Sequence, residues 1–311
     1  MADLSAVLLL FALFMYLALD GTDLGVGMLF SVFPDAQVRK WMAHPLLPVW
    51  DANETWLVLL AGGMLALFPP LYSEVLQRLM VPLFLFLLLL FTRALALSYR
   101  AQVGERGQRW LDRLLMLSSL GASFLPGWLA GQVLISRPPV GIVLDTSLVP
   151  VLCGAGLVAL DLLMGCCWMC WRIGKPIEER ARLIAGFWWI VMIACLLGVI
   201  LLEPTLWRIS AQRWPGMVAL CAVTGLLIAQ GLALWREAMV MALMLSLALI
   251  GGMMVALAAG LYPWLLPEQL AMDSAASNPV TQRVVVIAML ILLPLIIIYH
   301  TWSFWIFKRK E

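Results

Sequence analysis

Long apolar segments separated by short polar connections make up the whole chain. A helix that crosses a bilayer needs about 20 mostly apolar residues. Nine segments reach that length, at residues 5–33, 47–68, 77–99, 111–135, 147–171, 181–203, 215–235, 238–265 and 282–307. Strand-type alternation is absent, and the longest connection (266–281) is polar and rich in helix-breaking residues. The pattern therefore predicts an all-α integral membrane protein, one polytopic domain over residues 1–311 with about nine transmembrane helices.

Composition supports the membrane assignment. The chain is 64% hydrophobic and 12% charged, whereas soluble domains are roughly 45–50% apolar and about 25% charged. The net charge of +2 is too small to indicate a nucleic-acid partner. Several of the 15 tryptophans lie near segment ends, as in the aromatic belts of membrane proteins. We expect lipid contacts and no nucleic acid.

The distribution of Lys and Arg predicts the orientation. With nine spans, fourteen of the 20 basic residues fall on the side of the C-terminus, five fall on the other side, and Arg93 lies inside a span. Basic residues concentrate in cytoplasmic loops. The N-terminus is therefore predicted outside and the C-terminus in the cytoplasm.

The first segment carries two acids in the run LDGTDLGVGM. Asp20 and Asp23 are three residues apart and share a helix face, while the glycines between and after them allow another backbone to approach closely. Two neighbouring carboxylates do not both ionise easily in a medium of low dielectric. The pair either joins helices through hydrogen bonds or forms a proton relay or cation site, and both interpretations stay open.

A second polar cluster, WDANETWL, opens the second segment. Asp51 and Glu54 are again three apart, follow Pro48, and lie at the cytoplasmic end in the predicted topology. The helix dipole stabilises carboxylates in a first turn, which is a sufficient structural explanation. The functional alternative is proton entry, with Trp50 and Asn53 adding hydrogen-bonding groups that order water.

Two further charges lie inside apolar segments. An unpaired guanidinium in lipid costs at least about 2.5–3.5 kcal/mol, so Arg93 is the expected counter-ion for one of the acids. Asp161, in the middle of the fifth segment, belongs to no motif. Helix contact and function are both open for it.

Cofactor signals are weak. The run GCCWMCW at 165–171 lacks the four ligands that zinc or an iron–sulfur cluster needs, and cysteines of this kind commonly pack between helices. His44 and His300 lack a plausible axial partner for haem in the sequence. Phosphate-binding loops, dinucleotide fingerprints and nucleophile elbows are also missing. The sequence predicts no metal, no redox centre and no catalytic nucleophile in this chain.

The two acidic runs, LDGTDLGVGML and PVWDANETWLVLLAGG, together resemble the signature of subunit II of cytochrome bd-type quinol oxidases. The resemblance continues in FTRALALSYR (91–100), in GASFLPGWLAGQVL (121–134) and in the closing stretch that begins MDSAASNPVTQ. It thus extends over nearly the whole chain. Nine spans with the N-terminus outside and the C-terminus inside also match that family.

The resemblance implies a respiratory-chain subunit of the bacterial cytoplasmic membrane. Its expected partner is a haem-bearing subunit I, which would hold haem b and haem d, oxidise quinol and reduce O2 to water. This chain would bind no haem, would support subunit I in a one-to-one pair, and would line a cytoplasmic proton-uptake path. A small single-helix accessory subunit and a structural quinone or lipid are further expectations.

The resemblance also assigns residues. Asp51 is the first candidate for the proton path. Ser98 stands where family members often carry a carboxylate, and a hydroxyl can bridge water but cannot hold a proton. The full set on the path is Asp51, Asp20, Asp23, Glu54 and Ser98, with Trp50, Asn53, Arg93 and Arg100 as structural or charge partners.

Two other function classes remain. A cation- or proton-coupled secondary transporter would use the same intramembrane acids, although such proteins often repeat their motifs in two halves and no second acidic run occurs in 150–311. A scaffold without proton conduction is the third hypothesis. Asp51→Asn separates it from a proton path, because a scaffold would keep turnover near the wild-type rate.

Overall fold

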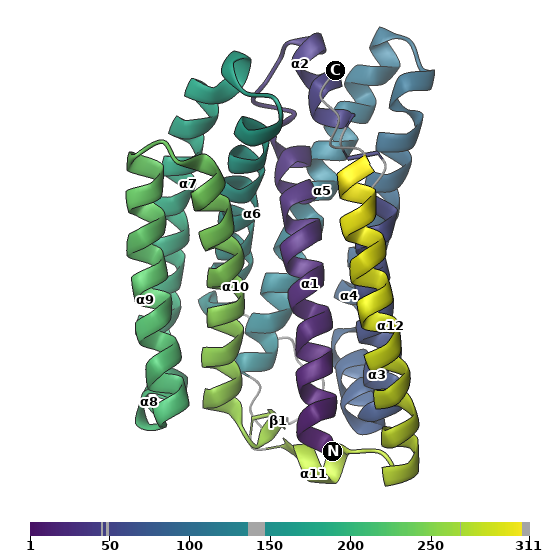
Figure 1. Ribbon diagram of the computed structural model, residues 1–311, viewed down its shortest axis with the longest axis vertical. Coiled ribbons are helices and arrows are strands. Elements are labelled where there is room, and N and C mark those ends of the chain that lie inside the picture. The colour runs from purple at the N-terminus through teal and green to yellow at the C-terminus, as the bar shows by residue number, and fades with distance from the viewer. Residues whose placement is uncertain (45, 48–49, 136–146, 268, 307–311) are drawn as a thin grey trace.

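The computed structural model describes residues 1–44, 46–47, 50–135, 147–267 and 269–306 as a bundle of long helices (Figure 1). A long helix occupies each of the nine predicted segments, because each is apolar over enough residues. These helices are α1 (Ala2–Leu29), α3 (Trp50–Leu67), α4 (Pro69–Tyr99), α5 (Glu105–Leu134), α6 (Leu148–Arg172), α7 (Lys175–Leu202), α9 (Trp214–Trp235), α10 (Met239–Leu261) and α12 (Pro279–Ile306). The predicted all-α class is confirmed.

Eight helices in the described part of the chain are long and apolar enough to cross a membrane. The remaining one of the nine is α3, which has only 18 residues and carries Asp51, Asn53 and Glu54 in its first turns. These polar residues lower its hydropathy. A ninth crossing, and the orientation of the bundle in a bilayer, stay predictions.

The apolar pattern does not predict several short elements of the structure. They are α2 (Ala36–Ala43), the 3₁₀ turn η1 (Arg100–Gln102), α8 (Pro204–Gln212), β1 (Trp264–Leu266), β2 (Leu270–Ala271) and α11 (Met272–Ala275). The polar connection predicted at 266–281 contains short regular elements, since β1 and β2 pair antiparallel around its start and α11 follows. Ser277 then fixes this segment to the end of α3, donating from its backbone N to Leu67 O and from Oγ to Ala66 O.

The helix α4 begins well before its predicted start near residue 77. Pro69 and Pro70 open it, which is favourable because a helix leaves its first N–H groups unpaired. Pro82 lies inside the helix, and the backbone is non-helical at Leu79, with φ −116° and ψ 16°. A proline removes one helical hydrogen bond and displaces the carbonyl four residues earlier. The kink therefore follows from the sequence.

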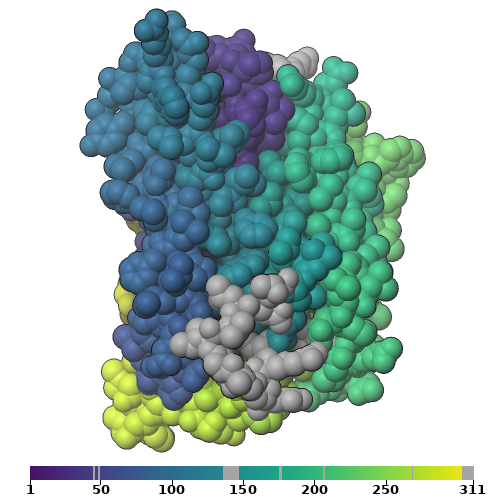
Figure 2. All heavy atoms as spheres, turned by 180° about the vertical axis from the view of Figure 1, so that it is seen from behind, coloured from purple at the N-terminus to yellow at the C-terminus, as the bar shows by residue number. Residues whose placement is uncertain are grey.

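α1 lies in the middle of the bundle, with α6 on one side and α3, α4 and α12 on the other (Figure 1). The N-terminus is at the same end as α11 and the β1–β2 hairpin, while α2 lies at the opposite end, here called the α2 end (Figure 1). The reverse face shows α4 and α5 along one edge and α7 along the other (Figure 2).

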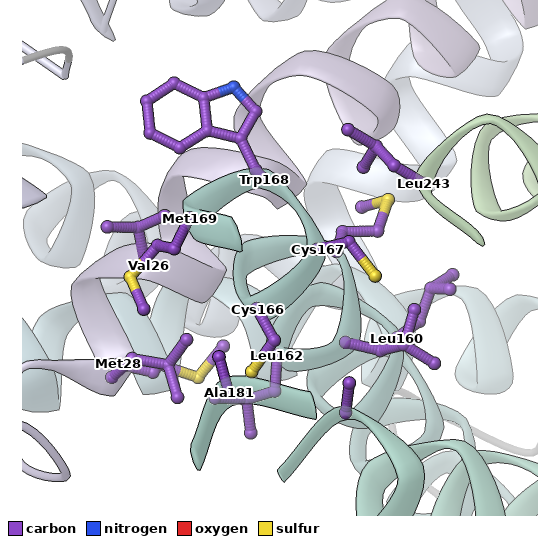
Figure 3. Packing of buried hydrophobic residues seen from close by; sticks show 14 of the residues in the cluster. Val26, Met28, Leu160, Leu162, Cys166, Cys167, Trp168, Met169, Ala181 and Leu243 are labelled. Carbon is purple, nitrogen blue, oxygen red and sulfur yellow. The ribbon is translucent and has the colours of Figure 1, made fainter. Parts of the chain in front are cut away.

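Two large apolar clusters meet at α1. One contains Val26, Met28, Cys166 and Cys167 (Figure 3). Cys170 belongs to the same cluster. The other joins α1 to α3, α4 and α12 through residues such as Trp56 and Phe86. The described cysteines are free thiols. The three of the GCCWMCW run pack among apolar side chains, as the packing interpretation of this run expects.

Candidate functional site

A buried ion pair lies where α1 meets α4. Arg93 Nη2 donates to Asp20 Oδ1 at 2.7 Å, and the two side chains are 3% and 0% exposed. Arg93 is therefore the counter-ion of one motif acid, as its position inside an apolar segment predicts. Breaking such a pair from one side costs about 3–5 kcal/mol, because it leaves an uncompensated buried charge.

The second motif acid has a neutral partner. Asn53 Nδ2, on α3, donates to Asp23 Oδ2 at 2.8 Å, and both side chains are buried. The amide of the WDANETWL run thus points inward to the LDGTDLGVGM run and joins α3 to α1. Arg93 is within electrostatic reach of Asp23 but is bonded to Asp20.

Three other predicted path residues share a groove between α3 and α4. The groove has a volume of about 690 Å³, and Asp51, Glu54 and Ser98 line it together with Trp50. Asp51 is exposed, and Glu54 is half-buried. Tyr99 and Gln102 also line it beside these polar residues, and the rest of the lining is apolar: Leu57, Val58, Leu87, Leu90, Phe91, Ala94 and Leu95.

Glu54 connects the groove with the interior. Its Oε1 is buried and has no hydrogen-bond partner among the described residues. The carboxyl is within electrostatic reach of Asp51 on the groove side and of Arg93 and Asp20 on the buried side. The structure therefore brings Asp51, Glu54, Asp20 and Asp23 into one region around α3, α4 and α1.

Arg100 lies apart from these acids. Its Nε donates to Asp112 Oδ1 at 2.6 Å, and Arg39 Nη1 donates to Asp112 Oδ2 at 2.9 Å. Arg39 also donates to Phe33 O at 2.7 Å. Arg100, in η1 at the end of α4, is thus a structural residue that ties this turn to α5, while Arg39 ties α2 to the same Asp112. Sequence reasoning missed Asp112, because three arginines lie within six residues of it and its partner could not be chosen from spacing.

Asp161 joins the buried region from α6. Ser123 Oγ, on α5, donates to Asp161 Oδ2 at 2.6 Å, and Asp161 is within electrostatic reach of Asp20. Tyr16 is buried one turn before Asp20 and interacts electrostatically with both acids. Sequence reasoning left Asp161 open and missed Tyr16 and Ser123. The sequence does contain a signal for the contact between α1 and α6. Gly21 and Gly25 on α1 are four residues apart, and so are Asp161 and Gly165 on α6.

The remaining titratable candidate, His300 on α12, packs against Trp56 with ring centroids 5.9 Å apart, and its Nδ1 lies 3.0 Å from Ile296 O. Over the described residues, His, Cys, Asp and Glu side chains form no group of three that could hold a metal ion. The chemistry that this site supports is proton binding and exchange by carboxyl groups. Together, the apolar helices and the buried acids define a polytopic membrane protein with a cluster of carboxyl groups at its centre.

Comparisons with known proteins identify the family. The family model described as cytochrome bd terminal oxidase subunit II matches residues 1–307. Cytochrome bd ubiquinol oxidase subunit 2 of Bacillus subtilis is 26% identical, over 94% of this chain and 91% of that protein. Cytochrome bd-I ubiquinol oxidase subunit 2 of Escherichia coli is 36% identical over 93 residues, which are 29% of this chain and 24% of that protein. The structure of bd oxidase from Geobacillus thermodenitrificans shares the fold, with a TM-score of 0.82 at 18% identity, covering 99% of this chain and 100% of that one.

The chain belongs to the cytochrome bd terminal oxidase subunit II family. It is therefore a subunit of an oxidoreductase complex in the bacterial inner membrane, and its family implies a partner subunit 1.

Proposed function

We propose that this chain supports a haem-bearing subunit I and conducts protons to it from the cytoplasm. Quinol would be oxidised in subunit I, where haem b and haem d would carry electrons to O2 and reduce it to water. The observation that carries the proposal is the connection between the Asp51 groove and the buried Asp20 and Asp23. Acids inside membrane helices are costly, and they mark proton or ion pathways.

The path begins in the groove. Asp51 is exposed there and takes up a proton from water, and Glu54 lines the groove while its Oε1 is buried without a partner among the described residues. The next groups inward are Asp20, bonded to Arg93, and Asp23, bonded to Asn53. Ser98 on the groove wall orders water beside Asp51, in place of the carboxylate that relatives often carry. Water molecules complete the transfer between carboxyls.

The groove also indicates the surface against which subunit I would pack. Its apolar walls are exposed, with Val58 71% and Phe91 61% accessible, and they flank a carboxylate. A carboxylate beside lipid costs free energy unless another protein surface covers it. Subunit I, packed against α3 and α4, would shield Asp51 from lipid and receive the protons.

Asp51→Asn tests the path. Asparagine keeps the shape of the side chain but cannot hold a proton, so quinol-driven O2 consumption should fall about 10- to 100-fold. The reduced-minus-oxidised haem spectrum of the purified complex should stay normal. Asp273→Asn, which changes an exposed acid at the opposite end of the bundle, is the matched control and should keep full activity. Full activity of Asp51→Asn in a normally assembled complex would remove Asp51 from the path.

A further inference from the structure

The crossing of α1 and α6 places Asp161 directly against the acidic motif. A Cβ atom on Gly25 would lie 1.9 Å from Asp161 O, and one on Gly165 would lie 2.5 Å from Gly25 C. Such distances are sterically forbidden, so the two backbones touch only because both residues are glycine. One turn away, a Cβ atom on Gly21 would lie 2.5 Å from Asp161 Oδ1. The carboxyl of Asp161 therefore points at α1, beside Asp20.

The charges around this crossing do not balance if every acid is ionised. Asp20, Asp23 and Asp161 are 0%, 6% and 2% exposed. Among the described residues, Asp20 forms an ion pair with Arg93, whereas Asp23 and Asp161 form none. Asp23 is bonded to an amide and Asp161 to a hydroxyl, and both donors are neutral. Three carboxylates with one guanidinium would leave two buried negative charges, each costing several kcal/mol.

The hydrogen bonds indicate which oxygen of Asp161 carries a proton. Ser123 Oγ donates to Oδ2, so Oδ2 is the acceptor oxygen. Oδ1 is buried, faces Gly21, and has no hydrogen-bond partner in the described part of the chain. Asp20 Oδ2 is likewise buried without a partner, and so is the Tyr16 hydroxyl. Tyr16 is a close side-chain neighbour of Asp20 and also interacts electrostatically with Asp161.

We propose that Asp161 is a further proton-holding group of this subunit, neutral at rest and exchanging its proton with Asp20 through the Tyr16 hydroxyl. The Oδ1–H bond of Asp161 breaks as its proton passes to a bridging water molecule, which gives one of its own protons to the Tyr16 oxygen. The Tyr16 O–H proton passes at the same time to Asp20 Oδ2. One proton has moved, Asp161 has become the carboxylate, Asp20 has become neutral, and the total charge of the cluster is unchanged.

This position makes Asp161 a proton store on a side branch. It lies on α6, whereas the groove lies between α3 and α4 on the other side of α1 (Figure 1). The inference rests on the proposed proton path only for the route by which the stored proton reaches water. The structural alternative is that Asp161 only joins α6 to α5 through its hydrogen bond with Ser123. Asparagine can accept that bond equally well, so Asp161→Asn separates the two roles.

The experiment is infrared difference spectroscopy of the purified complex on exchange from H2O to D2O. A protonated carboxyl that exchanges shifts its C=O band in D2O, whereas a carboxylate has no such band. We expect Asp161→Asn to remove one exchanging band with the haem spectrum intact. Asp112→Asn is the matched control, because Asp112 is paired with two arginines, and it should remove none.

Two more variants keep the test decisive if Asp161→Asn fails to assemble. Ser123→Ala removes the hydrogen bond to Oδ2 and should move the same band to higher frequency, while Tyr16→Phe should slow its exchange. An assembled Asp161→Asn complex with an unchanged set of bands would overturn the proposal, as would a Ser123→Ala spectrum identical to wild type. Failure of the Asp51 path would appear in O2 consumption and would leave the Asp161 band in place, so the two failures are distinguishable.

Discussion

Replacing Arg93 by glutamine should destabilise the protein more than any exposed charge change. Arg93 and Asp20 are 2.7 Å apart and almost fully buried, so Arg93→Gln leaves the Asp20 carboxylate without a counter-ion. One-sided loss of a buried pair costs about 3–5 kcal/mol. A cost of 1.4 kcal/mol is tenfold in an equilibrium constant, so the folded-to-unfolded ratio should fall by about 10² to 10⁴.

The assay is a double-mutant cycle in detergent, with equilibrium unfolding followed by circular dichroism. Asp20→Asn combined with Arg93→Gln removes both charges and should recover part of the loss. Arg78→Gln is the control, since Arg78 is partly accessible, pairs at 3.0 Å with the half-buried Glu74 and also donates to Gln269, so its ion pair should contribute about 0–1 kcal/mol. Equal stability of Arg93→Gln and wild type, or no recovery in the double variant, would refute the assignment of a buried charge pair.

Three other outcomes are expected. Gly25→Leu should prevent close contact of α1 with Asp161 and lower thermal stability in detergent, measured by aggregation on heating, while Gly62→Ala, with open space around it, should change little. Asp112→Ala should free two arginines at the α2 end and increase limited proteolysis of the segment around α2, with the helix content unchanged. Ser98→Glu adds a proton-holding group to the groove, so quinol-driven O2 consumption should be at least as fast as in wild type. A decrease would contradict the position of Ser98 on the proton path.

The long helices were predictable because each depends on one property, an apolar stretch long enough for a bilayer. The short elements depend on local chemistry that the hydropathy pattern does not contain. The helix α2 begins where Asp35 Oδ1 accepts hydrogen bonds from the backbone N–H groups of Gln37 and Val38. The hairpin after α10 has strands of three and two residues, too short for a periodic signal.

The residue types of the site were predictable from the sequence, but most of the pairs that they form were not. Arg93 is a basic residue inside an apolar segment, so its pairing with an acid followed from the cost of burial. The choice of Asp20 over Asp23 depends on how α4 lies against α1, which spacing along the chain does not determine. Asn53 was predicted to be a structural partner or to order water, and the structure shows that it donates to Asp23. Arg100 was predicted to be a structural or charge partner, but its partner Asp112 could not be chosen from the sequence.

The most direct test of the central claim is the rate of proton uptake by the complex in lipid vesicles. A pH-sensitive dye would report uptake from the side of the α2 end after a pulse of O2 to the quinol-reduced complex, in wild type, Asp51→Asn and Asp273→Asn. The account predicts that uptake slows about tenfold or more in Asp51→Asn and stays unchanged in Asp273→Asn, because only the first variant removes a proton-holding group from the groove. Equal uptake rates in all three complexes would contradict it.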